Sequence, residues 1–196
     1  MVQPGEQKAT GRRAGADALA LSLSLPLILS LRLIVSLSLV TQDSPALVII
    51  TGSKQGMTIP PGTGAAYNAS KAAVKAFAEV LAHDLRAAST KVDVKLLVPG
   101  WVYTKLSTGG SPPDDAAKPA GAWSAAQCAA ELFSRLASAP REFYIVCPDN
   151  ETSTELDYAR IAWSAGDVLE RRTALSRWDP AYKDEYERFI RERVPE

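Results

Sequence analysis

Two apolar runs on either side of a helical pattern constrain the fold of this chain more than any other feature. Residues 46–50 (ALVII) and residues 92–98 (VDVKLLV) each predict a buried strand. Between them, residues 66–88 carry an apolar stripe at helical spacing, formed by Val74, Phe77, Ala78, Leu81 and Leu85. A strand, a helix and a strand in this order predict a βαβ unit with two parallel strands.

Further elements extend this unit towards the C-terminus. We expect a helix over residues 124–138, a third strand over residues 142–147, and a helical, charged and aromatic tail from Glu155 onward. The predicted fold class is therefore α/β with a parallel sheet. At 196 residues with 46% hydrophobic content, the chain is long enough to bury one core.

Tyr67 and Lys71 lie four residues apart, which places the phenol and the ammonium on one face of the predicted helix. A nearby cation favours the phenolate, so this pair suits a proton donor and acceptor. Lowering the pKa of a tyrosine from about 10 to about 7 requires roughly 4 kcal/mol of differential stabilisation. The pair alone is a weak signal, and its neighbours in the sequence make it specific.

Both predicted strands of the βαβ unit end in loops that carry glycine and hydroxyl residues. Residues 51–56 (TGSKQG) follow the first strand, and residues 99–104 (PGWVYT) follow the second. Open α/β sheets bind ligands at the carboxyl ends of their strands. We therefore expect Ser53, Gly100 and Thr104 to lie close to a ligand.

These motifs together resemble the catalytic half of the classical short-chain dehydrogenase/reductases. The matching pattern is strand-Gly-Ser-x-x-Gly, Tyr-x-x-x-Lys on a helix, and strand-Pro-Gly-x-Val-x-Thr. Residues 52–56 (GSKQG), 60–62 (PPG) and 66–71 (AYNASK) are similar to a fungal-type subgroup of that family. The resemblance covers roughly Pro45 to the C-terminus. It implies a Rossmann-like three-layer parallel sheet with flanking helices, N-terminally truncated, with the last strands of the family sheet retained.

The resemblance implies an NAD(P)-dependent oxidoreductase that interconverts an alcohol and a carbonyl by hydride transfer. Tyr67 would be the acid and base, Lys71 would assist it, and Ser53 would donate a hydrogen bond to the substrate oxygen. The residues implied to bind the cofactor are Tyr67, Lys71, Pro99, Gly100, Val102 and Thr104. An epimerase-like relative shares Tyr-x-x-x-Lys but fits the Pro-Gly-x-Val-x-Thr segment less well.

The sequence before Pro45 departs from the family pattern. Residues 10–17 (TGRRAGAD) are the only counterpart of the glycine-rich turn that binds pyrophosphate, and Asp17 places an anion there. No asparagine precedes Asn68, and no position identifies NAD or NADP as the cofactor. The chain then divides into an atypical leucine- and serine-rich segment, residues 1–44, and the catalytic half, residues 45–196. The alternative is a catalytically inactive truncated relative, either an interaction protein or a fragment.

Residues 18–40 form an apolar, leucine-rich run that is long enough to cross a bilayer. Arg12 and Arg13 precede it as a cytoplasmic flank would, whereas Arg32 and Pro26 disfavour a spanning helix. Three interpretations stay open: an altered N-terminus of a truncated reductase, a membrane or signal anchor, and a divergent buried helix. We expect a cytoplasmic protein, or alternatively one associated with a membrane through this run.

The composition excludes several kinds of partner and site. The net charge is 0, with 22 residues of each sign, so we expect no nucleic-acid partner. Cys128 and Cys147 lie in no metal or redox spacing, and His83 is the only histidine, so we expect no metal site. The expected partner is a small alcohol or carbonyl substrate.

Two segments near the C-terminal half each allow two interpretations. Residues 107–122 predict either a substrate lid or a plain loop, and the aromatic tail predicts either a homo-oligomer contact or a cover over the cleft.

Overall fold

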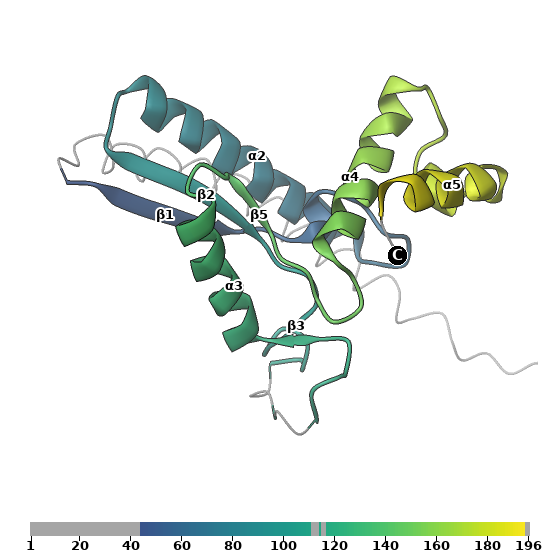
Figure 1. The fold of residues 1–196 in the computed structure, drawn as a ribbon, viewed down its shortest axis with the longest axis horizontal. Coiled ribbons are helices and arrows are strands. Elements are labelled where there is room, and N and C mark those ends of the chain that lie inside the picture. Colours follow the sequence, from purple (N-terminus) through teal and green to yellow (C-terminus); the bar gives the residue numbers. More distant parts are fainter. Residues whose placement is uncertain (1–43, 111–113, 115–116, 195–196) are drawn as a thin grey trace, which may run out of the picture.

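The computed structural model describes residues 44–110, 114 and 117–194. Its centre is a parallel sheet of three strands, β1 (Ala46–Thr51), β2 (Val92–Val98) and β5 (Tyr144–Val146), in the order β1-β2-β5 (Figure 1). The three predicted strands are therefore confirmed, although the third is shorter than residues 142–147. The run 18–40 and the turn 10–17 lie outside the described residues.

The middle strand, β2, is buried along almost its whole length. It pairs with β1 from Ala46↔Val92 to Thr51↔Leu97, and with β5 from Leu96↔Tyr144 to Val98↔Val146. A strand with neighbours on both edges and helices on both faces favours a continuous valine and leucine run. Two polar residues interrupt the run. Asp93 is exposed, whereas Lys95 is buried and its ammonium donates to the Pro140 carbonyl at 2.6 Å.

Helix α2 (Ala65–Ala87) covers one face of the sheet, as the apolar stripe predicts. Ala78, Leu81 and Leu85 are fully buried. They pack against the side chains that β2 directs to this face, which are Val92, Val94, Leu96 and Val98. Burying a leucine side chain stabilises the fold by about 1.5–3 kcal/mol, so this contact fixes the helix on the sheet.

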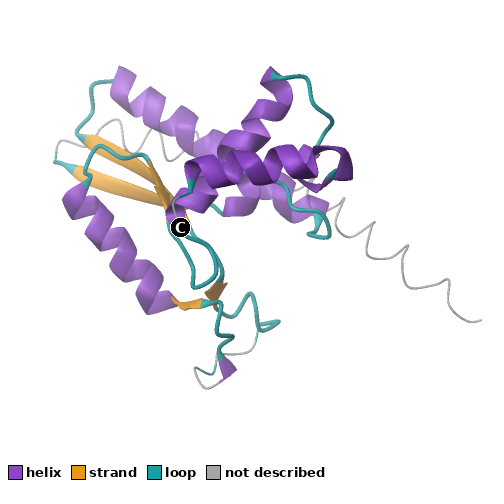
Figure 2. Ribbon diagram, turned by 45° about the vertical axis from the view of Figure 1, so that its right-hand side comes forward, coloured by secondary structure: helices purple, strands orange, loops and turns teal. Residues whose placement is uncertain are grey.

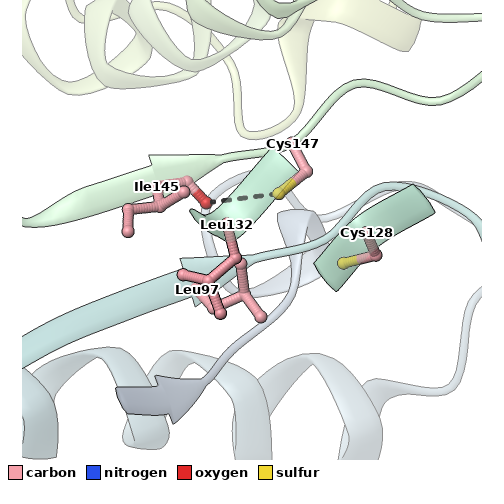
Figure 3. Packing of buried hydrophobic residues seen from close by; sticks show 5 residues of the cluster. All are labelled: Leu97, Cys128, Leu132, Ile145 and Cys147. Carbon is pink, nitrogen blue, oxygen red and sulfur yellow. Dashed lines mark hydrogen bonds between the residues drawn. The ribbon is translucent and has the colours of Figure 1, made fainter. Parts of the chain in front are cut away.

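Helix α3 (Ala125–Ser138) covers the opposite face. Leu97, which alternates with Leu96 and Val98 along β2, packs there in a cluster with Cys128, Leu132, Ile145 and Cys147 (Figure 3). Ser124 and Gln127 form a capping box that starts the helix. One helix on each face gives the three layers of the predicted α/β class.

The C-terminal tail folds into a helical pair, α4 (Thr154–Leu169) and α5 (Lys183–Arg193), beyond the carboxyl ends of the strands (Figures 1 and 2). Trp163 on α4 is 1% exposed and holds the pair together. Its indole Nε1 donates to Ser176 Oγ at 2.8 Å, and the guanidinium of Arg172 lies 3.8 Å from its ring centroid. Phe189 of α5 packs edge-on to the same indole at 5.1 Å.

Several short elements join these layers. They are the 3-10 turns η1 (Lys54–Gly56), η3 (Ser176–Trp178) and η4 (Pro180–Tyr182), and a two-stranded parallel sheet of β3 (Val102–Tyr103) and β4 (Trp123–Ser124). The sequence did not predict β3 and β4, because two residues are too few to show a strand pattern. Within the described ranges, no helix has the length and apolar character needed to cross a bilayer.

Candidate active site

A cavity of about 720 Å³ lies where the loops after β1, β2 and β5 meet the C-terminal helices. Six of the seven residues predicted for the site line it, namely Ser53, Tyr67, Pro99, Gly100, Val102 and Thr104. Lys71 is not part of the lining, and its Nζ lies over the Tyr67 ring. The cavity therefore joins three segments that are far apart in the sequence.

Ser53 occupies the first position after the buried Gly52 and caps η1. Its Oγ accepts a hydrogen bond from the Gln55 amide at 3.2 Å. Gly56 ends η1 in direct contact with α2, because a Cβ there would lie 2.6 Å from the Lys71 carbonyl oxygen. The glycine thus allows the serine loop to pack closely on the helix that carries Tyr67.

Tyr67 lies in the first turn of α2, and a tight turn fixes where this helix begins. Gly62 follows two prolines and has a φ of +79°, a conformation that glycine adopts readily. The Thr63 hydroxyl donates to the Pro60 carbonyl at 2.6 Å, and the buried Asn68 donates to Thr63 Oγ1 at 2.8 Å. The Pro-Pro-Gly segment and Asn68 therefore orient the start of α2, and with it the phenol.

Lys71 connects the phenol to the end of β1. Its Nζ lies 5.7 Å from the centroid of the Tyr67 ring and donates to the Thr51 carbonyl at 3.4 Å. The spacing of four residues on a helix thus brings the ammonium to the tyrosine ring. The positive charge is held beside the phenol from the side that faces the sheet.

Among the described residues, three hydroxyl groups of the cavity find no acceptor for their protons. Neither the Tyr67 hydroxyl nor the Thr104 hydroxyl forms a hydrogen bond with any residue that the structure describes, and Ser53 Oγ only accepts one. The backbone of Thr104 is fixed by a turn, since its N–H donates to Ser107 Oγ at 2.9 Å. These hydroxyls are free to donate to a ligand in the cavity.

Sequence reasoning missed a buried ion cluster beside these residues. Lys54 Nζ pairs with Asp149 Oδ2 at 3.3 Å and also with Asp157 on α4. The Lys54 side chain is 18% exposed and the two carboxylates 9% and 6%. Asp149 lies three residues after the end of β5, so its place at the carboxyl edge of the sheet was a usable signal. Asp157 and Arg160 come from the tail, whose position over the sheet only the tertiary fold determines.

The pKa values of the two carboxylates in this ion cluster are shifted in opposite directions. Burial raises the pKa of Asp149, but hydrogen bonds from backbone amides and the charge of Lys54 outweigh it, and the net pKa is lowered. The donors include the Trp101 amide at 3.0 Å and the Thr152 amide at 2.8 Å. Burial raises the pKa of Asp157, and Lys54 only partly offsets it. Asp149 is therefore the better stabilised anion.

Gly100 lines the cavity, and the structure gives a second reason for a glycine there. The sequence predicts a close approach of a ligand to its backbone. A Cβ at this position would lie 2.5 Å from Asp149 Oδ2 and 2.7 Å from Lys54 Nζ. Glycine therefore leaves room for the ion pair below the loop.

The C-terminal segment also contributes to the cavity. The lining includes Arg160 of α4 and both Arg177 and Trp178 of η3. These residues are far in the sequence from Ser53 and Tyr67. Of the two roles expected for the aromatic tail, Trp178 fits a cover over the cleft. Ser107, the first residue of the predicted lid, and Leu106 just before it line the cavity as well.

Two comparisons relate the chain to known proteins. The family model for short chain dehydrogenases matches residues 27–113, a stretch that holds all seven predicted site residues and begins upstream of Pro45. A crystal structure of a short chain dehydrogenase/reductase from Burkholderia phymatum, in complex with NAD, is 28% identical with a TM-score of 0.53. The match covers 66% of this chain and 50% of that chain, so the chain spans half the length of that protein.

A search of curated proteins found no match. The family match and the solved structure nevertheless agree on one family, and they agree with the α/β fold and its parallel sheet. The chain is thus similar to the short-chain dehydrogenase/reductases, in fold and over the segment that carries the candidate site.

Proposed function

We propose that this chain is an oxidoreductase of the short-chain dehydrogenase/reductase family that interconverts an alcohol and a carbonyl with NAD(P). The observation that carries this proposal is the meeting of the Ser53, Tyr67 and Thr104 hydroxyls at one cavity, with the Lys71 ammonium behind the phenol. The family match over residues 27–113 and the NAD complex of the similar structure support it.

The residues around the cavity fit the nicotinamide end of such a cofactor. The volume of about 720 Å³ lies within the range of roughly 300–1,000 Å³ that is typical of small-molecule sites. Pro99, Gly100 and Val102 offer a wall without charge, and Thr104 offers a free hydroxyl. When NAD(P) is bound, it supplies or accepts the hydride.

The chain itself would handle the proton. In the reductive direction, Tyr67 Oη donates its proton to the carbonyl oxygen, and in the oxidative direction it takes the proton back from the alcohol. Ser53 Oγ donates a hydrogen bond to the same oxygen and stabilises the charge that develops there. The Lys71 ammonium stabilises negative charge on the Tyr67 oxygen while the proton is away.

The proposal is tested by separating cofactor binding from proton transfer. The full chain is titrated with NADH and NADPH, and turnover is then measured with a panel of ketones and keto acids. Tyr67→Phe should retain cofactor affinity and lose turnover by about 10²–10⁴-fold, the usual contribution of general acid–base catalysis. Tyr182→Phe is the matched control, since Tyr182 does not line the cavity, and it should keep full turnover.

Two results would count against the proposal. No saturable binding of either cofactor at millimolar concentration favours the inactive relative instead. Full turnover in Tyr67→Phe rejects Tyr67 as the acid and base even if the chain is an oxidoreductase.

A further inference from the structure

Two arginines on the C-terminal helical segment line the cavity that holds Tyr67 and Ser53. Arg160 comes from α4 and Arg177 from η3, and we refer to them as the arginine pair. Neither forms an ion pair with a described acidic residue. Arg160 NH1 donates only to the Thr152 hydroxyl, at 3.3 Å, and its buried Nε has no hydrogen-bond partner. A buried guanidinium nitrogen without a partner is costly unless a ligand satisfies it.

The second guanidinium, that of Arg177, lies over two aromatic rings. Its carbon lies 4.7 Å from the centroid of Trp178 and 5.5 Å from that of Tyr186. A cation–π contact attracts the guanidinium without using its N–H groups as hydrogen-bond donors. Burial, followed by repulsion from Arg160, lowers the pKa of Arg177. The protein therefore keeps two mutually repelling cations at this site.

The charges around the cavity do not cancel. The charged lining consists of three cations, Lys54 and the arginine pair, and two anions, Asp149 and Asp157. Lys54 is paired with both carboxylates, and neither carboxylate lies at salt-bridge distance from the arginine pair, although Asp157 attracts both arginines at longer range. One positive charge is left over, which a single negative charge would balance. A carboxylate carries one, and its two oxygens suit guanidinium N–H donors.

We propose that the arginine pair binds a carboxylate of the substrate, so that the compounds oxidised or reduced at Tyr67 are hydroxy acids and keto acids. The reaction assigned to these compounds rests on the proposed function, whereas binding of the carboxylate does not. The pair belongs to a different segment from the proton-transfer residues. It would therefore bind and orient one end of the substrate while Ser53 and Tyr67 act on the other.

The test measures binding without cofactor, so that it does not depend on turnover. The probes are 4-oxopentanoate, its neutral methyl ester and inorganic phosphate, and the readout is quenching of tryptophan fluorescence, because Trp101 and Trp178 line the cavity. The acid should bind about 10–100-fold more tightly than the ester, as expected for hydrogen bonds between charged groups. Arg177→Gln and Arg160→Gln should each reduce the affinity for the acid by about 10–100-fold and leave that for the ester unchanged.

Controls keep the test decisive. Arg141→Gln removes one positive charge from an exposed residue outside the cavity and should leave all affinities unchanged. Arg177→Lys keeps the charge and should retain more affinity for the acid than Arg177→Gln. Thermal melting checks that each variant folds, and 4-oxopentanoate should raise the melting temperature of the natural chain but not of Arg177→Gln.

Each alternative outcome overturns the proposal in a recognisable way. Equal affinity for acid and ester, or no quenching by the acid up to about 50 mM, rejects a carboxylate site. If phosphate binds more tightly than the acid, the group that the arginine pair binds is a phosphate and not a carboxylate. If Arg160→Gln or Arg177→Gln weakens the binding of NADH or NADPH and leaves the affinity for the acid unchanged, the arginine pair binds the cofactor instead. Failure of the proposed function would instead appear as absent turnover with the binding of the acid intact.

Discussion

Replacing Lys54 by methionine should destabilise the protein strongly, and more so at high pH. Methionine keeps most of the apolar length of lysine and removes the charge, so the variant leaves Asp149 and Asp157 without their cation. Their side chains are only 9% and 6% exposed. Removing one partner of a buried ion pair costs about 3–5 kcal/mol. Asp149 keeps its backbone amide donors, which places the expected loss near the lower end, at about 3 kcal/mol.

The pH dependence follows from Asp157. Burial already raises the pKa of this carboxyl, and loss of Lys54 raises it further. Between the unfolded pKa, about 3.9, and the folded one, the native variant binds a proton that the unfolded chain has released. Its stability is therefore highest below that window and falls as pH rises through it. The loss relative to the natural chain should be smaller at pH 5 than at pH 8, by about 1 kcal/mol or more.

Urea unfolding at pH 5 and pH 8, followed by circular dichroism, measures both effects. Lys183→Met is the control, because Lys183 is 72% exposed and lies 4.0 Å from its partner Glu187. Exposed pairs of this kind contribute about 0–1 kcal/mol. A loss below about 1 kcal/mol for Lys54→Met at pH 8, or an equal loss at both pH values, would refute the reasoning about the buried ion cluster.

Two further substitutions test close packing. Gly100→Ala places a methyl group 2.5 Å from Asp149 Oδ2 and should cost about 1–3 kcal/mol by urea unfolding. Gly64→Ala, where a Cβ meets nothing within 4 Å, should cost only the preference for glycine over alanine at the N-cap of α2, about 1 kcal/mol or less. A loss at Gly100 no greater than that at Gly64 would contradict the steric argument. Ser176→Ala leaves the buried Trp163 Nε1 without its acceptor and should lower the unfolding free energy by about 1–3 kcal/mol. An unchanged thermal midpoint would show that this hydrogen bond contributes little.

The sheet and its main helix were predictable because their signals are local. The strands are short apolar runs, and the stripe that includes Ala78, Leu81 and Leu85 has the period of a helix, so tertiary contacts reinforce what the sequence already favours. The structure places the helix within one residue of the predicted bounds. Two-residue strands such as β3 carry no such pattern, and they form only because two loops meet.

The sequence predicted the residues of the candidate site that lie near strand ends, but not those that the C-terminal tail contributes. Ser53, Tyr67 and Thr104 follow strands or begin a helix, so the rule for carboxyl edges brings them together. Asp157 and Arg177 come from the tail, where charge and aromatic content show helices but not the surface on which they pack. Lys54 occupies a variable position in the Gly-Ser-x-x-Gly motif, and only its contact with Asp157 reveals it as part of the ion cluster.

The register of the sheet also has a consequence for the time course of folding. Every pair in the β1–β2 ladder joins residues 46 positions apart, as in Ala46↔Val92, and every pair in the β2–β5 ladder joins residues 48 apart, as in Leu96↔Tyr144. Closing such long loops costs chain entropy before any strand pairing repays it. The backbone hydrogen bonds within helix α2 are local, and a helix of this kind forms in about a microsecond or less. We therefore expect the docking of β2 between β1 and β5 to be the slow step, with the cavity forming after it.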